Sequence, residues 1–538
     1  METAVPSSDP VPGHRPDRPT HLSDLVARNA SERPGHDAVR DLSGAAPLTL
    51  TWSAFDAAVS AEAARLRAAG VRHGDRVAIG LPDGADYCVA LFGALRADAV
   101  VVPFGAGSVT RELEVVLDQA RPVAVVARPD DAVAAGCAEG VGATLLGPPD
   151  LAAPVPDAPV DRAPADPERI ALVVFTSGTT GRPRGVQLSH RALLANREQA
   201  GALRPAPVNG VDRVLLALPL FHVYGLAAGL LQVCWTGATV VLPGRFSPDR
   251  LAETVVEERV SVVAGVPSMF RMLLDLGPER LRAAMAGVRL CTSGGAPLPA
   301  GWLADFRAAS GLDLHEGYGL TEGGPVVTSN DLGRPAKPGS VGQVLPGVEL
   351  RLVDADGQPM ERRPAPEPEP RGEDPLDDLD YDDGSDPSDD TGLIAVRGPN
   401  LFSGYWPDGS GGPGEDGWFV TADVGYLDTD GDLHLVDRSS DLVIVNGFNV
   451  YPREVEQVVA ELDAVAEVAV VGVPDDRTGA AVKAVVVPVA GAELTEETVA
   501  AHCAARLARF KRPAVVAFAD ELPRTPTGKI ARRTLARM

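Results

Sequence analysis

The chain has 538 residues, of which 45% are hydrophobic and 23% charged, and its formal net charge is -25. This length exceeds what one hydrophobic core holds, so at least two domains are expected, and the acidic balance argues against a nucleic-acid partner because such a surface repels a polyanion. Five scattered cysteines without a C-x-x-C pair argue against a disulfide framework or a zinc site. They indicate a reducing compartment, and we expect a cytoplasmic protein.

The N-terminal part of the chain predicts an α/β architecture. Residues 1–20 are polar and proline-rich and lack the apolar core of a signal peptide, so we expect an N-terminal tail there. Short β-branched runs then alternate with amphipathic helical patterns, such as a helix at 55–70 that ends on a glycine. Strands are expected at 76–81, 99–104, 123–127, 171–175, 261–266 and 288–293. Such alternation indicates largely parallel sheets.

One long segment of the chain carries no charged residue. Residues 214–244 contain no Asp, Glu, Lys or Arg, which is long enough to resemble a membrane span. However, two prolines, a histidine and four glycines interrupt it, and its pattern breaks into strand, helix and strand. We interpret it as buried core and expect no transmembrane segment.

The C-terminal third contains an acidic segment and a second, compact unit. Residues 361–390 hold thirteen acidic residues and three arginines, so we expect a disordered surface insertion, with a docking role as the alternative. Beyond residue 441, helices are expected at 452–462 and 494–508 and strands at 465–473 and 481–489. This pattern predicts an α+β unit of ordinary domain size.

The stretch FTSGTTGRPRG (175–185) follows a buried strand and has the composition of a phosphate-binding loop. Its glycines let backbone N–H groups approach a ligand closely, its hydroxyls add donors, and Arg182 and Arg184 add positive charge. A Walker loop is excluded because no Gly-Lys-Ser/Thr follows the glycines. The alternative is a solvated turn rich in small polar residues.

Four later segments also combine glycines with hydroxyl-bearing or charged residues. They are CTSGGAPL (291–298), HEGYGLTE (315–322), TADVGYLDTDGDLHLVDRSSD (421–441) and RTPTGKIARR (524–533). Together and in this order they resemble the adenylate-forming acyl-CoA synthetases, the superfamily shared with firefly luciferase and the adenylation domains of non-ribosomal peptide synthetases. The resemblance runs from about residue 20 to the C-terminus, and LPLFHVYGL (218–226) with DRSSDLVIVNGFNVYPREVE (437–456) is most like fatty-acid CoA ligases.

The resemblance implies a fold and a domain division. A large AMP-binding domain at 21–439 would consist of layered α/β sheets with a smaller distorted-barrel part. A small, mobile α+β domain would follow at 440–538, with a hinge at Ser440. Relatives often carry Asp or Lys at that position, so Ser440 is a departure from the family pattern.

The resemblance also implies how ATP binds. The phosphate loop would grip the β- and γ-phosphates through a set comprising Thr176, Ser177, Gly178, Thr179, Thr180, Gly181 and Arg184. Arg184 replaces the usual lysine; it keeps the charge but differs in reach and hydration. The adenine and ribose set would comprise Gly294, Gly295, Ala296, Pro297, Tyr318, Gly319, Asp423 and Arg438. Tyr318 as a core residue and Asp423 as a turn residue are the alternatives.

Chemistry is assigned by the same resemblance. Thr321 would bind the α-phosphate, and Glu322 would hold Mg²⁺, which suits a hard oxygen donor. Lys529 would bridge the substrate carboxylate and the α-phosphate; a solvated lysine in a basic tail is the alternative. His222 lies where the family often has a gate over the carboxylate site, or it is a satisfied core histidine.

The implied reaction makes the chain an acid–thiol ligase that uses ATP and coenzyme A. A fatty acid would first become an acyl-adenylate, and the CoA thiol would then displace AMP, with Gly447 lining the pantetheine channel. The alternatives are an acyl-AMP ligase that loads a separate carrier protein and a noncatalytic adenylate-binding homologue. No fused carrier domain is expected, and the oligomeric state, monomer or homodimer, stays open.

Overall fold

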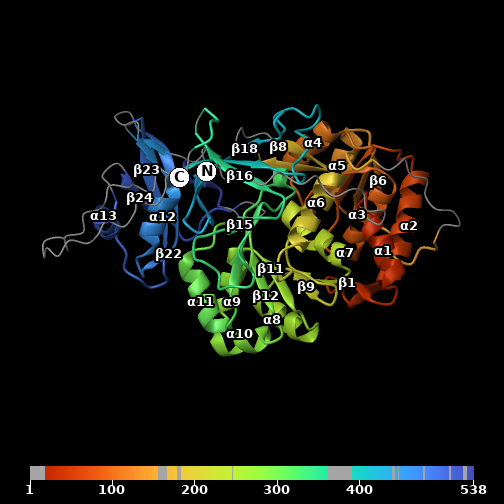
Figure 1. Cartoon of the computed structure of the whole chain (residues 1–538), viewed down its shortest axis with the longest axis horizontal. Helices are drawn as coiled ribbons and strands as arrows, with labels where there is room; N and C mark the ends of the chain where they lie inside the picture. The colour runs from red at the N-terminus through yellow and green to blue at the C-terminus, as the bar shows by residue number, and fades with distance from the viewer. Residues whose placement is uncertain are drawn as a thin grey trace, which may run out of the picture.

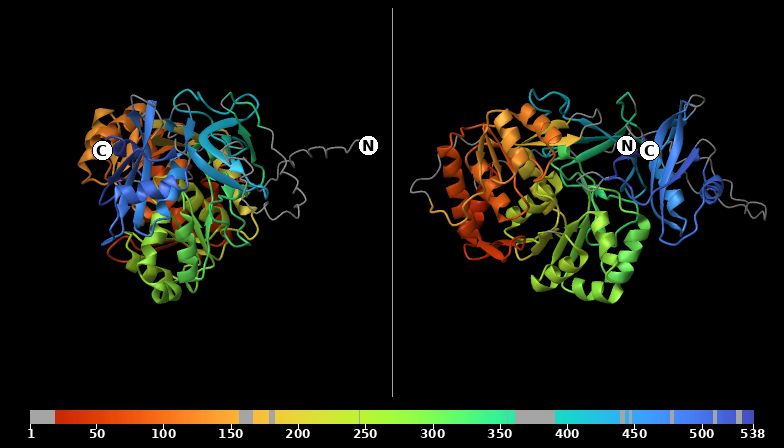
Figure 2. Two further views of the ribbon diagram at one scale, coloured as in Figure 1. Left: turned by 90° about the vertical axis from the view of Figure 1, so that its left-hand side faces the viewer. Right: turned by 180° about the vertical axis from the view of Figure 1, so that it is seen from behind.

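The computed structural model describes residues 19–155, 166–177, 183–244, 246–354, 356–360, 391–438, 443–445, 448–475, 479–507, 511–524 and 530–538. The expected α/β class is confirmed: two large mixed sheets with helices form most of the N-terminal part, a smaller antiparallel part follows, and a small α+β unit ends the chain. In Figures 1 and 2 the first sheet and its helices are red to orange, the second is mostly yellow to green, and the C-terminal unit is blue. The expected N-terminal tail, the segment 361–390 and the expected boundary at 439/440 lie outside the described residues.

The first sheet has six strands in the order β6-β5-β3-β4-β7-β8. Its strands are parallel except for β8, which returns antiparallel to β7. They are β3 (Arg76–Gly80), β4 (Val100–Pro103), β5 (Ala124–Ala127), β6 (Thr144–Leu146), β7 (Ile170–Ser177) and β8 (Pro183–Ser189). Its helices are α2 (Trp52–Ala68), α3 (Ala85–Arg96), α4 (Thr110–Ala120) and α5 (Ala132–Gly140). The central strands are continuous apolar runs because both faces of a parallel sheet are buried.

The second sheet has seven strands in the order β13-β12-β11-β9-β10-β1-β2, parallel except for β2 at one edge. They are β1 (Asp37–Asp41), β2 (Leu48–Thr51), β9 (Arg213–Leu216), β10 (Thr239–Leu242), β11 (Val262–Gly265), β12 (Leu290–Ser293) and β13 (Leu314–Glu316). Its helices are α1 (Asp24–Glu32), α6 (His190–Gly201), α7 (Gln232–Thr236), α8 (Pro248–Glu257), α9 (Pro267–Leu274), α10 (Pro278–Met285) and α11 (Ala300–Ser310).

The charge-free segment 214–244 is buried core, as the sequence predicts. It forms β9, a π-helix η1 (Tyr224–Leu231), α7 and β10, so strand, helix and strand follow in the expected order. Among the described residues, no helix combines the length and the apolar character that crossing a membrane requires. All five cysteines are buried free thiols.

The antiparallel part joins the sheets to the C-terminal unit. A four-stranded sheet has the order β16-β17-β18-β19, from β16 (Glu349–Val353), β17 (Gly392–Arg397), β18 (Phe419–Leu427) and β19 (Leu433–Arg438). A 3₁₀ turn η2 (Thr321–Gly323) and the ribbon β14 (Thr328–Ser329) with β15 (Gln343–Val344) precede it. Segment 361–390 lies between β16 and β17 in the sequence, and the described residues on either side of it are close together, because a Cβ on Gly392 would come 2.5 Å from the sulfur of Met360.

The C-terminal unit contains its own apolar core. Its three-stranded sheet consists of β22 (Val465–Asp475), β23 (Gly479–Pro488) and β24 (Val515–Phe518), with a ribbon of β20 (Val443–Val445) and β21 (Phe448–Val450). Helices α12 (Pro452–Ala460), α13 (Glu496–Ala504) and α14 (Arg532–Leu535) complete it. Buried valines of the sheet, such as Val470 and Val486, pack with Val455 and Val499 of α12 and α13.

Candidate active site

Two neighbouring parallel strands end where the adenine and phosphate residues are expected. β12 ends directly before Gly294, and β13 ends directly before the sequence GYGLTE (317–322). Ser293 and Glu316, the last residues of the two strands, are paired in register. The two segments therefore leave the sheet side by side at its carboxyl edge, which is the usual ligand-binding position in such sheets.

The residues expected at adenine and ribose are in contact with each other. The hydroxyl of Tyr318 donates to Oδ2 of Asp423 at 2.6 Å, although the two residues are 105 positions apart. Tyr318 is buried beyond β13, whereas Asp423 is half-buried on β18 and pairs in register with Arg438 of β19. The structure thus brings the segment after β13 into contact with β18 of the antiparallel sheet, where an aromatic ring and a carboxylate meet.

The glycines expected at adenine are required by close packing. A Cβ on Gly294 would lie 3.1 Å from the ring of Tyr224, and Gly295 has a φ of +78°. At Gly319, a Cβ would lie 2.1 Å from the carbonyl oxygen of Pro325, so a side chain there would collide with backbone. Ala296 is half-buried and Pro297 is exposed.

Tyr224 is a site residue that the sequence reasoning missed. It begins the π-helix η1, a helix type that often occurs at functional sites, and its ring lies against Gly294. Burial raises the pKa of Tyr224 to about 12, partly opposed by a hydrogen bond with Thr292, so the phenol stays neutral. The signal was available in FHVYG, where an aromatic residue follows the histidine in an uncharged run.

His222 lies at the start of the same turn. Its Nδ1 accepts the backbone N–H of Tyr224 at 3.2 Å, and the ring is half-buried. This contact places the histidine beside the tyrosine whose ring lies against Gly294. The gating role of His222 stays a prediction.

The phosphate loop joins β7 to β8 as a hairpin. Thr176 pairs with Arg184, and β7 ends at Ser177, which pairs with Pro183. The tip, with Gly178, Thr179, Thr180 and Gly181, lies outside the described residues. Thr176 is half-buried and Arg184 is exposed beside this tip.

The turn η2 places Glu322 near the hairpin of β7 and β8. Thr321 is buried and Glu322 is half-buried. Oε1 of Glu322 accepts the hydroxyl of Tyr405 at 2.8 Å, and the guanidinium carbon of Arg184 lies 3.5 Å from the centre of the Tyr405 ring. Tyr405 was not singled out from the sequence, where only the glycine before it in SGYW marks a turn.

Glu322 fits the coordination that Mg²⁺ prefers when it arrives with a nucleotide. Within the described residues, no three His, Cys, Asp or Glu side chains are grouped as metal ligands. A single carboxylate is sufficient for Mg²⁺, which keeps several waters and binds phosphate oxygens at the same time. Glu322, next to the phosphate hairpin, would hold such an ion.

The C-terminal unit lies beside this edge of the sheet. Arg453 of α12 donates to the carbonyl of Leu435 on β19 at 2.9 Å. Ser440, Gly447 and Lys529 lie outside the described residues, and of Arg438 the structure describes only the backbone. The predicted roles of these four residues therefore stay predictions.

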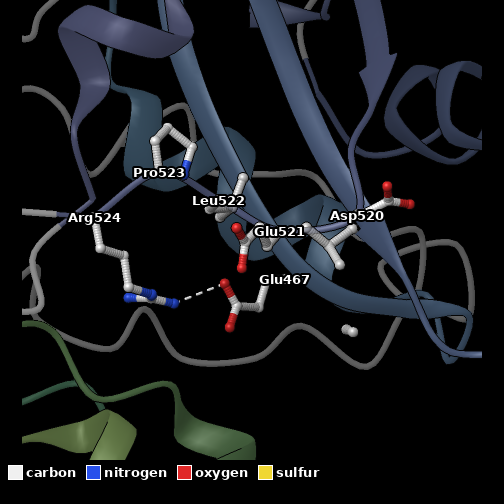
Figure 3. Close-up of a pocket in the computed structure, with 8 residues that line it drawn as sticks. Glu467, Asp520, Glu521, Leu522, Pro523 and Arg524 are labelled. Carbon is white, nitrogen blue, oxygen red and sulfur yellow. Dashed lines mark hydrogen bonds and ion pairs between the residues drawn. The ribbon is translucent and has the colours of Figure 1, made fainter.

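A cavity of about 430 Å³ in the C-terminal unit is not the nucleotide site. It is lined by Ala466, Glu467, Val487, Asp520, Glu521, Leu522, Pro523 and Arg524. Arg524 is paired with Glu467 at 2.7 Å, and Figure 3 shows this pair among the residues that line the cavity. Three carboxylates against one paired arginine would repel the phosphates of ATP or coenzyme A.

Glu316 is a third residue that the sequence reasoning missed, after Tyr224 and Tyr405. Its carboxylate is buried at the end of β13, and Oε1 accepts the N–H of Leu298 at 3.2 Å. Burial raises its pKa to about 7, opposed in part by that hydrogen bond and by the charge of Arg453. Its position directly before the Gly-Tyr-Gly turn was the available signal.

Replacing Glu316 by glutamine is expected to stabilise the protein at alkaline pH. The folded-state pKa of about 7 exceeds the ordinary value of 4.5, so the stabilising contribution of Glu316 is complete below pH 4.5 and is lost as pH rises through 7. Glu316→Gln does not titrate, so the difference in unfolding free energy between variant and wild type should grow by up to about 3 kcal/mol from pH 5 to pH 8. Melting temperatures across this range measure it, and a difference independent of pH would contradict the assignment.

Comparison with known proteins identifies the family. Residues 26–406 match the AMP-binding enzyme family, and residues 454–529 match the AMP-binding enzyme C-terminal domain. A feruloyl-CoA synthase from an Amycolatopsis species is 35% identical over 491 residues, covering 91% of this chain and 94% of that protein. A long-chain-fatty-acid–CoA ligase from Yersinia pestis is 33% identical over 508 residues, covering 87% and 85%.

A solved structure agrees with the sequence matches. The crystal structure of ATP-bound MatB from Rhodopseudomonas palustris is 32% identical and covers 96% of this chain and 98% of its own, with a TM-score of 0.83. The similarity thus extends over both the large and the small unit. The chain therefore belongs to the AMP-binding enzymes, the adenylate-forming family that includes the AMP-forming CoA ligases.

Proposed function

We propose that this chain activates a fatty acid as an acyl-adenylate and then transfers the acyl group to the thiol of coenzyme A. The observation that carries the proposal is the meeting of two side-chain pairs at the carboxyl edge of the second sheet. Tyr318 with Asp423 supplies a ring and a carboxylate for adenosine, and Tyr405 with Glu322 supplies a held carboxylate beside the phosphate hairpin. ATP would lie between these two pairs.

In the first half-reaction, a carboxylate oxygen attacks the α-phosphorus and pyrophosphate leaves. The phosphate loop provides donors for the charge that accumulates on the leaving group, and donors that are already in place need no reorganisation. Mg²⁺ would neutralise phosphate charge when bound. Thr321, buried next to Glu322, would donate to the α-phosphate, and Lys529 would neutralise the two anions as they approach.

In the second half-reaction, the thiolate of coenzyme A attacks the acyl carbonyl, the carbon–oxygen bond to AMP breaks, and AMP leaves with that oxygen. A mixed anhydride reacts readily because AMP is a far better leaving group than the oxide of a free carboxylate. Ser440 would act as the hinge that turns the small domain between the two steps, and Gly447 would leave room for the pantetheine arm.

A fatty acid is proposed as the substrate on two grounds. The segment LPLFHVYGL enters the apolar helix η1, and the Yersinia pestis relative is a long-chain-fatty-acid–CoA ligase. A second candidate is an aromatic acid, which is favoured by the Amycolatopsis relative and by the ring of Tyr224 next to the glycine segment.

The substrate is tested by AMP release with a matched panel of acids in the presence of coenzyme A. Each buried methylene should contribute about 0.8 kcal/mol, so kcat/KM should rise about fourfold per carbon from C4 until the site is full. If kcat/KM stays constant or falls with chain length while ferulate is used efficiently, the substrate is an aromatic acid rather than a fatty acid. A parallel assay with a carrier protein identifies the acceptor, and no turnover with any acid would support a noncatalytic homologue.

A further inference from the structure

The segment 402–406 connects the phosphate hairpin to the turn that carries Glu322. Its backbone pairs with β8 on one side, because Ser403 donates to the carbonyl of Gln187 at 2.9 Å and Trp406 donates to that of Gly185 at 2.7 Å. On the other side, the N–H of Phe402 donates to the carbonyl of Glu322 at 2.9 Å. One short segment thus fixes the distance between β8 and η2.

Side chains also connect β8 to η2, on the side where ATP is proposed to bind. The guanidinium of Arg184, on β8, lies over the ring of Tyr405, with 3.5 Å between its central carbon and the ring centre. The hydroxyl of the same tyrosine donates to Oε1 of Glu322 at 2.8 Å.

Close packing fixes the Tyr405 ring in this orientation. A Cβ on Gly411 would lie 3.1 Å from the ring and 3.3 Å from Nη2 of Arg184, and the φ of Gly411 is +67°. A Cβ on Gly185 would lie 3.0 Å from the Cβ of Trp406, so that glycine lets the two segments approach. The ring is therefore bordered by the guanidinium and by the backbone of Gly411.

We propose that Arg184 and Tyr405 are positioning residues that orient the carboxylate of Glu322 for Mg·ATP. Arg184 holds the ring by stacking, and the hydroxyl of the ring holds Oε1, so that the carboxylate is preset before the nucleotide arrives. A planar guanidinium stacks on an aromatic ring better than an ammonium does, which gives the arginine at this position a role beyond its charge. The inference rests on the proposed function and adds to it how the metal carboxylate is oriented.

Nucleotide binding without any carboxylic acid separates this role from direct phosphate binding. Calorimetric titration with ATP in excess Mg²⁺ and with ATP in EDTA gives two dissociation constants, and their ratio reports how much Mg²⁺ strengthens binding. Tyr405→Phe keeps the ring and removes the hydroxyl, and it should lower this ratio about tenfold while leaving binding in EDTA unchanged. Arg184→Met should lower the same ratio severalfold.

The double variant Arg184→Met/Tyr405→Phe decides whether the two residues act in series. Because Arg184 acts through the hydroxyl of Tyr405, the double variant should lower the ratio of the two dissociation constants no further than Tyr405→Phe alone does. In a Glu322→Gln background, neither change should alter the ratio. Tyr426→Phe is the matched control: Tyr426 is also half-buried but stacks on His434 at 4.8 Å, and its variant should bind like the wild type.

Three outcomes would overturn the proposal. An unchanged ratio in Tyr405→Phe, with normal binding in EDTA, removes the positioning role and leaves the proposed function intact. If Arg184→Met weakens ATP binding equally with and without Mg²⁺, and if this effect adds to that of Tyr405→Phe, Arg184 contacts the phosphates directly. Failure of the wild-type protein to bind ATP under either condition would overturn both the positioning role and the nucleotide site.

Discussion

Replacing Lys529 by alanine is expected to slow acyl-adenylate formation by on the order of a hundredfold or more, while transfer from a synthetic acyl-adenylate to coenzyme A continues at nearly the normal rate. The ammonium is required where two anions must approach before the new bond forms. It would not be required once the anhydride exists, because the proposed rotation of the small domain would then remove it from the site. Carboxylate-dependent ATP–pyrophosphate exchange measures the first step, and thioester formation measures the second.

Arg524→Ala is the matched control for Lys529→Ala. Arg524 belongs to the same basic segment, but its guanidinium is paired with Glu467 in a partly exposed ion pair, which contributes little. Both half-reactions should be retained in this variant. Equal losses of the two half-reactions in Lys529→Ala would contradict the alternation of the small domain, and no loss in either would make Lys529 a solvated residue of the tail.

Replacing Asp423 by alanine is expected to weaken ATP binding by on the order of a hundredfold, and this change should impair both half-reactions. Asp423 would accept the ribose hydroxyls in ATP and in the acyl-adenylate alike, and a hydrogen bond to a charged acceptor contributes about 1.5–3 kcal/mol. The variant also leaves the Tyr318 hydroxyl without the acceptor that lies 2.6 Å away. The dissociation constant of ATP and the KM for acyl-adenylate measure the two effects.

Two milder variants separate the ribose contact from the support that Asp423 gives to Tyr318. Tyr318→Phe keeps the ring and removes only its hydroxyl, so ATP binding should weaken no more than about tenfold. Asp423→Asn keeps an acceptor without the charge and should be intermediate. An unchanged dissociation constant for ATP in Asp423→Ala would exclude the ribose role and leave Asp423 as a partner of Tyr318 alone.

The parallel sheets were predictable from the sequence because their strands are continuous apolar runs. The run at 76–81 became β3 (Arg76–Gly80), and the run at 171–175 became the longer β7 (Ile170–Ser177). The resemblance implied a smaller distorted-barrel part, but the sequence pattern did not locate the strands β16 to β19 of the antiparallel sheet. The acidic segment 361–390 separates β16 from β17 in the sequence, so no short-range pattern connects these paired strands.

The sequence motifs nominate the candidate site residue by residue but do not predict the contacts between these residues. Tyr318, Glu322 and Asp423 were each identified by the motif in which they lie. Tyr405 and Tyr224 were missed, since their roles depend on residues that are distant in the chain: Glu322 is 83 positions before Tyr405, and Tyr224 packs on a glycine of another strand end. Glu316 was missed for a different reason, because a carboxylate at a strand end is notable only once its burial is known.

The central claim is that a carboxylate oxygen becomes bonded to the phosphorus of AMP, and isotope transfer tests it most directly. An acid that the enzyme accepts is supplied with ¹⁸O in both carboxylate oxygens, together with ATP, Mg²⁺ and coenzyme A, and the released nucleotide is analysed by mass spectrometry. Adenylation predicts AMP that carries one ¹⁸O atom, because the carbon–oxygen bond breaks when the thiol attacks. Unlabelled AMP, or ADP with labelled inorganic phosphate, would contradict the account.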